Sequence, residues 1–187
     1  CGILTIIEVE GTPTGLSAIT VSDENGDPLA FIYAGAPAGG CMDSFACNYD
    51  AEAVEDDGSC DYDCNDDGVP DALVFETSTQ SAAYFFTNVV IDDAPVASDD
   101  WVGAFNGDVC VGATQWDTSQ CGNGVCSVNV GGFDGNPNTQ GYLGIGDTPT
   151  FKIFDVSENR YYDAITSEPI TPFIPLGFQP INSLGYC

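Results

Sequence analysis

Residues 63–71 read Asp-Cys-Asn-Asp-Asp-Gly-Val-Pro-Asp and carry the residue types that bind a hard metal ion. Oxygen-bearing side chains recur at alternate positions, so they can point to one side of a tight coil, and Gly68 permits the sharp turn that the coil needs. The expected ligands are the side chains of Asp63, Asn65, Asp67 and Asp71 and the carbonyl oxygen of Val69. Because calcium takes several oxygen ligands, this stretch predicts a calcium site.

The match to an EF-hand loop is partial. Val74 stands where the closing bidentate glutamate would be, and Pro70 disfavours an exit helix. The pattern Asp-x-Asn-x-Asp-Gly-x-x-Asp instead resembles the calcium repeats of the thrombospondin type 3 family. That resemblance implies calcium binding without flanking helices, in stiffened linkers of extracellular proteins. The alternative interpretation is a solvated acidic turn that binds no ion.

The composition of the chain excludes several classes of function. Its 187 residues include 29 acidic and 2 basic ones, for a net charge of −27, so nucleic acid and anionic membranes would be repelled. No stretch approaches the ~20 apolar residues that a membrane span needs. The sequence has no histidine, and the adjacent carboxylates of Asp99 and Asp100 would point to opposite faces of a strand. We therefore do not expect an enzyme.

The cysteines lie among turn-forming residues, as in disulfide-bonded proteins of oxidising compartments. They are Cys1, Cys41, Cys47, Cys60, Cys64, Cys110, Cys121, Cys126 and Cys187. Together with the acidic composition, they predict an extracellular or cell-surface protein. A zinc site formed by the four cysteines of residues 41–64 is the alternative, although only Cys60 and Cys64 have the spacing of a zinc finger.

The pairing of the other cysteines stays open. A disulfide between Cys121 and Cys126 would close a small loop of reasonable geometry. The odd number of cysteines leaves one thiol without a partner in the chain. Cys1 or Cys187 could be free or could bridge to another copy, and Cys1 could be a lipidated terminus.

Two resemblances concern whole segments. Gly-Cys-x-Asp from Gly40, Ala-Cys-Asn-Tyr-Asp from Ala46 and Asp-Asp-Gly-Ser-Cys from Asp56 form a pattern over residues 40–64. This pattern resembles a repeat of long secreted proteins from marine bacteria, especially the Bacteroidota. Residues 99–113 and 150–155 resemble a β-sandwich repeat of the same proteins. The resemblances imply secreted or cell-surface proteins built from tandem units, without an established ligand or activity.

The chain divides into three segments. Residues 1–40 form an N-terminal β segment, in which residues 2–9 are apolar on both alternating faces and residues 17–34 predict a hairpin. This segment is too small for a core of its own, so it should dock on the later domain or on a neighbouring subunit. We predict that residues 2–9 complete a sheet in an adjacent copy. Residues 41–71 form a cysteine-rich calcium-binding module, in which disulfides and calcium replace an apolar core.

Residues 72–187 predict an all-β domain, a β-sandwich of Ig-like or jelly-roll-like type. Strands are expected at residues 82–91, 101–105, 108–112, 150–156 and 160–165. Asn106-Gly107 predicts a type I′ turn that pairs Phe105 with Asp108.

Two further stretches lack regular patterning. The proline-rich tail over residues 168–180 should run as an extended edge or strap, anchored by Phe173, Ile174 and Phe178. Residues 133–141 offer oxygen ligands at alternate positions, but their low charge favours a turn over a second cation site.

These features favour a structural subunit or repeat of an extracellular filament or surface adhesin, made rigid by calcium and disulfides, with copies of itself as partners. The alternative is a calcium-dependent glycan-binding module of a secreted protein, in which aromatic rings stack on sugars beside the acidic residues. The candidate stacking residues are Trp101, Trp116, Tyr161 and Tyr162. Burial of Trp101 in a core is the competing interpretation.

Overall fold

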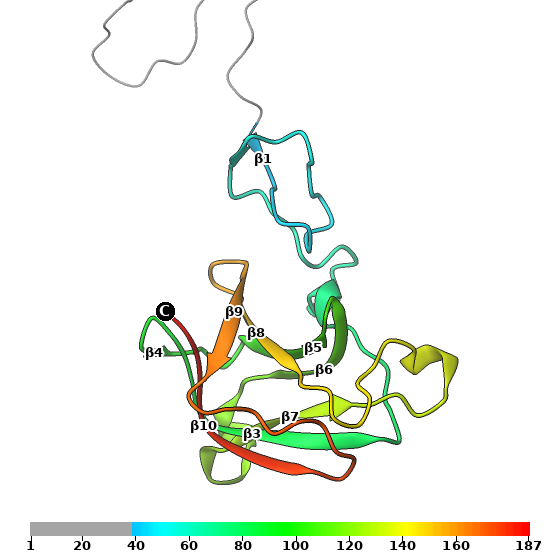
Figure 1. Ribbon diagram of the computed structural model, residues 1–187. Helices are drawn as coiled ribbons and strands as arrows, with labels where there is room; N and C mark the ends of the chain where they lie inside the picture. The colour runs from blue at the N-terminus through cyan, green and yellow to red at the C-terminus, as the bar shows by residue number, and fades with distance from the viewer. Residues whose placement is uncertain (1–38) are drawn as a thin grey trace, which may run out of the picture.

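The computed structural model describes residues 39–187, and these form an all-β fold, as the sequence predicts (Figure 1). The strand predicted at residues 2–9 and the hairpin after it lie outside the described residues. The strands are β1 (Gly39–Gly40), β2 (Glu55–Asp56), β3 (Ser81–Ile91), β4 (Ala94–Pro95), β5 (Trp101–Asn106), β6 (Val109–Gln115), β7 (Cys126–Gly131), β8 (Thr150–Asp155), β9 (Arg160–Thr166) and β10 (Phe178–Tyr186). Short 3₁₀ helices are η1 (Asp71–Leu73), η2 (Thr118–Gln120), η3 (Gly122–Gly124) and η4 (Pro137–Thr139). In this part of the chain, no helix has the length and apolar character to cross a membrane.

The main sheet has 8 strands, and its order is β4-β3-β10-β9-β8-β5-β6. β7 pairs with the first half of β3, and β4 pairs with the end of β3. All neighbouring strands in this sheet are antiparallel except β3 and β10, which run in parallel along nearly their whole length. The first long strand of the domain is therefore bonded to the last.

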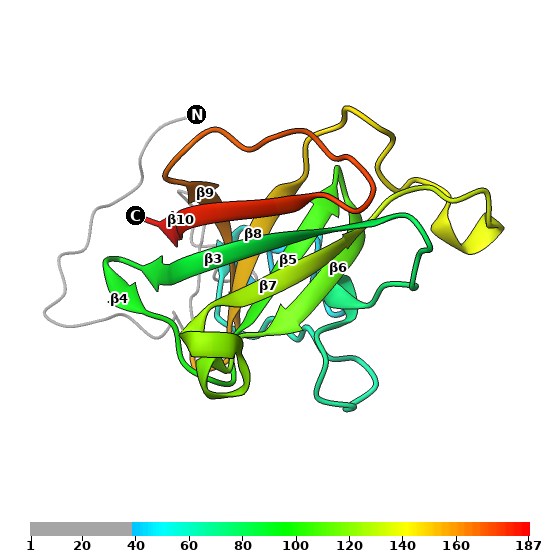
Figure 2. The same ribbon diagram turned by 90° about the horizontal axis from the view of Figure 1, so that it is seen from below.

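The sheet curls into two layers around the core. β7, β3 and β10 form a first layer, which lies across a second layer of β6, β5, β8 and β9 (Figure 2). Because side chains alternate along a strand, every second residue points between the layers. Tyr84 and Phe86 of β3 are buried there in one cluster with Val102 of β5 and Ile153 of β8. Each such burial contributes about 1.5–3 kcal/mol.

β6 and β7 approach each other closely along one side of the core. A Cβ atom on Gly112 of β6 would lie 2.0 Å from the carbonyl oxygen of Asn129 in β7, so only glycine fits. The Thr114 hydroxyl donates to the carbonyl oxygen of Ser127 at 3.1 Å. The two layers can therefore approach this closely only because residue 112 is a glycine.

On the other side, β9 and β10 pair only at one end. Residues 167–177, which we call the strap, connect them and bury the ring of Phe173 in the core. The predicted tail is confirmed at Phe173 and wrong at Ile174 and Phe178, which are exposed. The strap also ends earlier than predicted, because β10 begins at Phe178. Pro180 is tolerated inside this strand because its half of β10 pairs with β3 alone.

The turn between β5 and β6 differs from the predicted one. Phe105 pairs with Cys110 and Asn106 pairs with Val109, so the turn residues are Gly107-Asp108 and the predicted register is wrong. Gly107 has φ +62°, which suits the first central residue of a type II′ turn. The Asn106 side chain donates to the carbonyl oxygen of Gly141 at 2.9 Å, which holds it outside the turn centre.

The cysteine module is held by two disulfides, Cys41–Cys60 and Cys47–Cys64. The zinc alternative is therefore wrong, because oxidised sulfurs do not offer thiolates to a metal. A further disulfide, Cys121–Cys126, closes the small loop that the sequence suggested. Three disulfides in the described residues indicate an oxidising environment for the protein.

Candidate metal loop and module interface

The predicted calcium loop is a coil whose side-chain oxygens turn back onto its own backbone. The two carboxylate oxygens of Asp63 accept from the N–H groups of Asp67 at 3.1 Å and Gly68 at 2.7 Å. The Asn65 side chain also accepts from Asp67 N–H, at 2.9 Å. Asp66 and Gly68 have φ of +56° and +82°, which bends the chain around these oxygens. Asx turns of this kind are the reason that Asp and Asn fold here as a coil.

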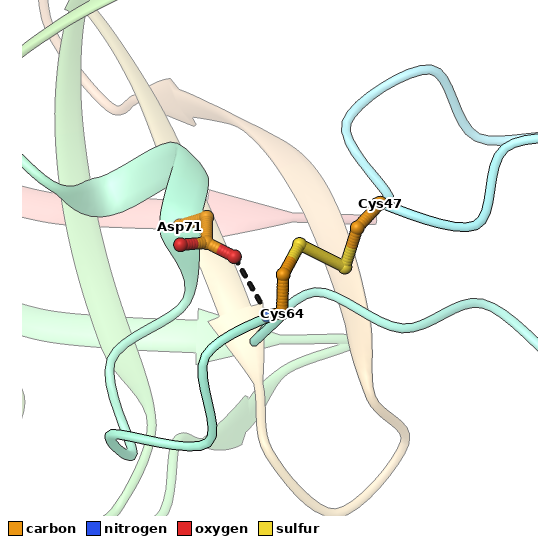
Figure 3. Close-up of side chains that lie close together, drawn as sticks. All are labelled: Cys47, Cys64 and Asp71. Atoms are coloured by element: carbon orange, nitrogen blue, oxygen red, sulfur yellow. Dashed lines mark hydrogen bonds between the residues drawn. A yellow bond between two sulfur atoms is a disulfide. The ribbon is translucent and has the colours of Figure 1, made fainter.

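Asp71 closes the loop at its far end. One of its carboxylate oxygens accepts from the N–H of Cys64 at 2.7 Å, beside the Cys47–Cys64 disulfide (Figure 3). The other oxygen accepts from the side-chain amide of Asn65 at 3.4 Å. Asp63, Asn65 and Asp71 therefore lie around one coil, as the alternating pattern predicts.

The oxygen donors of the loop suit calcium, whereas its carboxylate oxygens do not lie close enough together to share one ion. Among residues 39–187, one group of three acidic, cysteine or histidine side chains brings its ligand atoms within 4.8 Å of one another: Cys47, Cys64 and Asp71. Two of these are the sulfurs of a disulfide, so that group is not a metal site. The other predicted ligands offer only oxygen, as a hard cation requires. An ion in this loop would have to draw Asp63, Asp67 and Asp71 closer together.

The module packs directly onto the outer side of the second layer. Phe45 contacts Phe105 and Tyr161, with ring centroids 6.4 and 5.9 Å apart. Tyr62 contacts Phe154 and Tyr161 at 5.5 and 5.0 Å. These rings belong to a second buried cluster, separate from the core between the layers. The module and the sheet are thus joined by an apolar interface as well as by the chain.

Polar groups complete this interface. The Lys152 ammonium lies 4.8 Å from the ring centroid of Phe45 and forms an ion pair with Asp163. Asn159, in the turn between β8 and β9, donates its side-chain amide to the carbonyl oxygen of Cys60 at 2.6 Å. The Tyr62 hydroxyl donates to Asp43 at 2.7 Å, and its burial raises the pKa of that hydroxyl well above the usual range. Tyr62 therefore stays neutral and keeps its donor.

The candidate stacking residues do not form one surface. Trp116 packs on Phe86 and Tyr162 on Tyr186, and both are buried in the core between the layers. The prediction that these two rings stack on sugars is therefore wrong, because core packing uses their faces. Tyr161 is packed in the module interface. Trp101 borders a cavity of about 210 Å³ that Asp61 and Asp63 also line, next to the predicted calcium loop.

Asp100 is a structural carboxylate. It is buried, accepts from the N–H groups of Ala97 at 2.6 Å and Val156 at 3.0 Å, and so ties the entry of β5 to the turn after β8. Burial raises its pKa. With both oxygens occupied by backbone donors, Asp100 holds two loops together.

The loop at residues 133–141 is closed by hydrogen bonds within the protein. Asp134 accepts from the backbone N–H and hydroxyl of Thr79 at 3.0 Å each, and from the Thr139 hydroxyl at 2.7 Å. These hydrogen bonds lower the pKa of Asp134 strongly, and the one from the Thr79 N–H contributes most. The carboxylate of Asp134 thus accepts hydrogen bonds within a turn, as the sequence predicts for residues 133–141.

The sequence analysis did not predict that Phe45 and Tyr62 dock the module on the sheet. Aromatic side chains in a segment without a core of its own could have indicated this contact.

Comparisons of the chain with family models, with curated proteins and with solved structures found no match in any of the three.

Proposed function

We propose that the chain is a structural subunit or repeat of an extracellular filament or surface adhesin, kept rigid by disulfides and calcium. The observation that carries this proposal is the docking of a disulfide-bonded module onto the sheet through Phe45 and Tyr62. A unit that transmits position or load between neighbours needs its parts held at a fixed angle. The aromatic interface fixes that angle, which the chain connection alone does not.

Three finer statements belong to this proposal. The partners are other copies of the chain, and the location is the extracellular space or the cell surface, for which the three disulfides are the support. The two-layered sheet is a β-sandwich of Ig-like or jelly-roll-like type. The role is structural and not enzymatic.

Calcium binds in this proposal at residues 63–71. Side-chain oxygens of Asp63, Asn65, Asp67 and Asp71 and the Val69 carbonyl hold the ion. Binding draws the carboxylates together and offsets part of the repulsion within a chain of net charge −27. The disulfide Cys47–Cys64 and the Asp71 contact to Cys64 already connect this loop to the module, so a bound ion stiffens both.

Terbium luminescence tests the metal site, because terbium replaces calcium at oxygen sites and is excited by a nearby indole. Trp101 borders two cavities that loop residues also line. Asp67 and Val69 line one cavity, and Asp63 and Gly68 line the other. We expect sensitised emission that calcium displaces and that Asp67→Asn weakens at least tenfold in affinity. Asp66→Asn is the matched control, because it removes the same charge outside the ligand set and asparagine tolerates the φ of +56°. Equal loss in both variants, or no emission, would refute the site.

Electron microscopy and sedimentation velocity of the purified full chain test the structural role. We expect filaments or long oligomers in calcium, and shorter or more flexible ones after chelation or reduction. A chain that stays monomeric in every condition would contradict the role as a self-assembling subunit.

Calcium-dependent glycan binding is the second candidate, and Trp101 is the observation that favours it. Its ring borders the 210 Å³ cavity together with the carboxylates of Asp61 and Asp63. A glycan array probed with and without chelator decides this point. Specific, chelator-sensitive binding that Trp101→Ala abolishes would support it, and an array without signal would exclude it.

A further inference from the structure

The first layer of the sheet carries no charged side chain. β7, β3 and β10 contain neither Asp, Glu, Lys nor Arg, in a chain with 29 acidic residues. The second layer, by contrast, carries Lys152, Asp155, Arg160 and Asp163. Two copies of so acidic a protein repel each other wherever their carboxylates meet. The strands of the first layer add no charge of their own to that repulsion.

The strand register shows which residues of this layer point outward. Residues paired across a sheet point to the same side, and Ala82, Tyr84 and Phe86 point into the core, so their neighbours in β3 point out. The outward set, which we call the uncharged face, consists of Ala83, Phe85, Ser127, Asn129, Phe178 and Pro180.

Large apolar groups lie at the edge of the uncharged face. Phe178 stacks on Phe85 with ring planes 10° apart, yet Phe178 is 75% exposed. Leu176, at the end of the strap, is 82% exposed. The stacked rings of Phe85 and Phe178, with Leu176 two residues before Phe178 in the chain, leave apolar surface of the kind that interaction sites use.

The two outer sides of the sheet are therefore unequal. The module covers the outer side of the second layer through Phe45 and Tyr62. In the described residues no such cover lies over Phe178 and Leu176. The module and the uncharged face lie on opposite sides of the molecule, with both layers between them (Figure 1).

We propose that the uncharged face binds the N-terminal segment of a second copy of this chain, with residues 2–9 as its apolar contact. This inference rests on the proposed function and adds the surface through which copies meet. Residues 2–7 read Gly-Ile-Leu-Thr-Ile-Ile and are also free of charge, so they match the face in both apolar character and charge.

The position of β1 bears on which copy supplies this segment. The chain enters the described structure at Gly39, in the module, on the opposite side of the molecule from the uncharged face (Figure 1). A contact with the face of the same chain has to pass both layers of the sheet, whereas a contact with a second copy does not. Because residues 10–38 are long enough for that passage, at about 100 Å when extended, the experiment below also tests the contact within one chain.

Contact between two different surfaces has a geometric consequence. Each copy offers both a segment and a face, which are different surfaces, so the contact is head-to-tail and propagates into a filament or closes into a ring.

Complementation between two defective variants tests this arrangement. Leu176→Ser with Phe178→Ser removes the face, and deletion of residues 2–9 removes the segment. In sedimentation velocity we expect each variant alone to lose all species larger than a monomer. Their mixture should form a heterodimer that does not grow, because one copy lacks a free segment and the other lacks a free face. Phe133→Ser, a change of an exposed ring elsewhere, should assemble as the wild type does, and circular dichroism checks that each variant is folded.

The outcomes separate the inference from the proposed function. Wild-type assembly together with normal assembly of the Leu176/Phe178 variant would overturn the face and leave the structural role standing. A wild type that stays monomeric would overturn both. A monomer in which hydroxyl-radical labelling of the exposed side chains of Leu176 and Phe178 drops only when residues 2–9 are present would show that each chain covers its own face, which also overturns the proposal.

Discussion

Replacing Phe45 by alanine should release the cysteine module from the sheet while both parts stay folded. The ring contacts Phe105, Tyr161 and the Lys152 ammonium, the last at 4.8 Å from its centroid. Removal of a fully buried phenylalanine costs about 3–5 kcal/mol. Because Phe45 is only partly buried, we expect a loss of about 2–3 kcal/mol of docking free energy. The module itself should persist, because two disulfides close it.

Chymotrypsin cleavage after Tyr62 measures this release. Tyr62 is 3% exposed in the docked state, so cleavage requires that the interface open. If opening is fast relative to cleavage, 2–3 kcal/mol raises the cleavage rate about 30- to 150-fold. Tyr49→Ala is the control, since it removes an exposed ring from the same module and should leave the rate unchanged. An unchanged rate in Phe45→Ala, or loss of the sheet before Tyr62 is cut, would refute the reasoning.

Three further predictions follow from single contacts. Gly112→Ala should destabilise the fold by several kcal/mol in urea denaturation, because its Cβ would lie 2.0 Å from a backbone oxygen, whereas Gly122→Ala meets nothing within 4 Å and should cost little; equal effects would contradict this. Asp134→Asn should lower the melting temperature at neutral pH. Because folding lowers the pKa of Asp134, its carboxylate stabilises the fold above the unfolded pKa of about 4, and this stabilisation is lost on acidification. The difference in melting temperature between variant and wild type should therefore narrow in acid. A difference independent of pH would be inconsistent with this reasoning. Burial raises the pKa of Cys110 to about 11, so peptide mapping after alkylation at pH 8 should show label on exposed Cys187 and none on Cys110 until denaturant is added; rapid native labelling of Cys110 would argue against its burial.

The strands that sequence patterns predict well are those whose signals are local. β3, β5, β8 and β9 are runs of β-branched and aromatic residues between turn formers, and they lie close to the predicted positions. β7 was not predicted, because Cys126 to Gly131 is short and contains polar and small residues. β10 was not predicted either, because prolines precede it and its long pairing is to β3, distant in sequence.

The relation of the module to the sheet also depends on distant contacts. The coil at residues 63–71 follows from Asx turns and Gly68, which act within a few residues, so the alternating pattern is sufficient to predict the coil. Docking of Phe45 and Tyr62 needs Phe105, Phe154 and Tyr161 on strands far along the chain. No local pattern in residues 41–71 indicates those partners.

The parallel pairing of β3 and β10 determines how the domain would respond to tension. The chain enters the sheet at the start of β3 and leaves it at the end of β10. Pulling these two points apart slides the strands along each other, so the hydrogen bonds between them are loaded in shear and must break together. Antiparallel terminal strands joined at one end would instead peel open one bond at a time. In the module, the interleaved disulfides Cys41–Cys60 and Cys47–Cys64 carry the tension in place of most of the backbone between residues 41 and 64. That segment therefore lengthens little under tension.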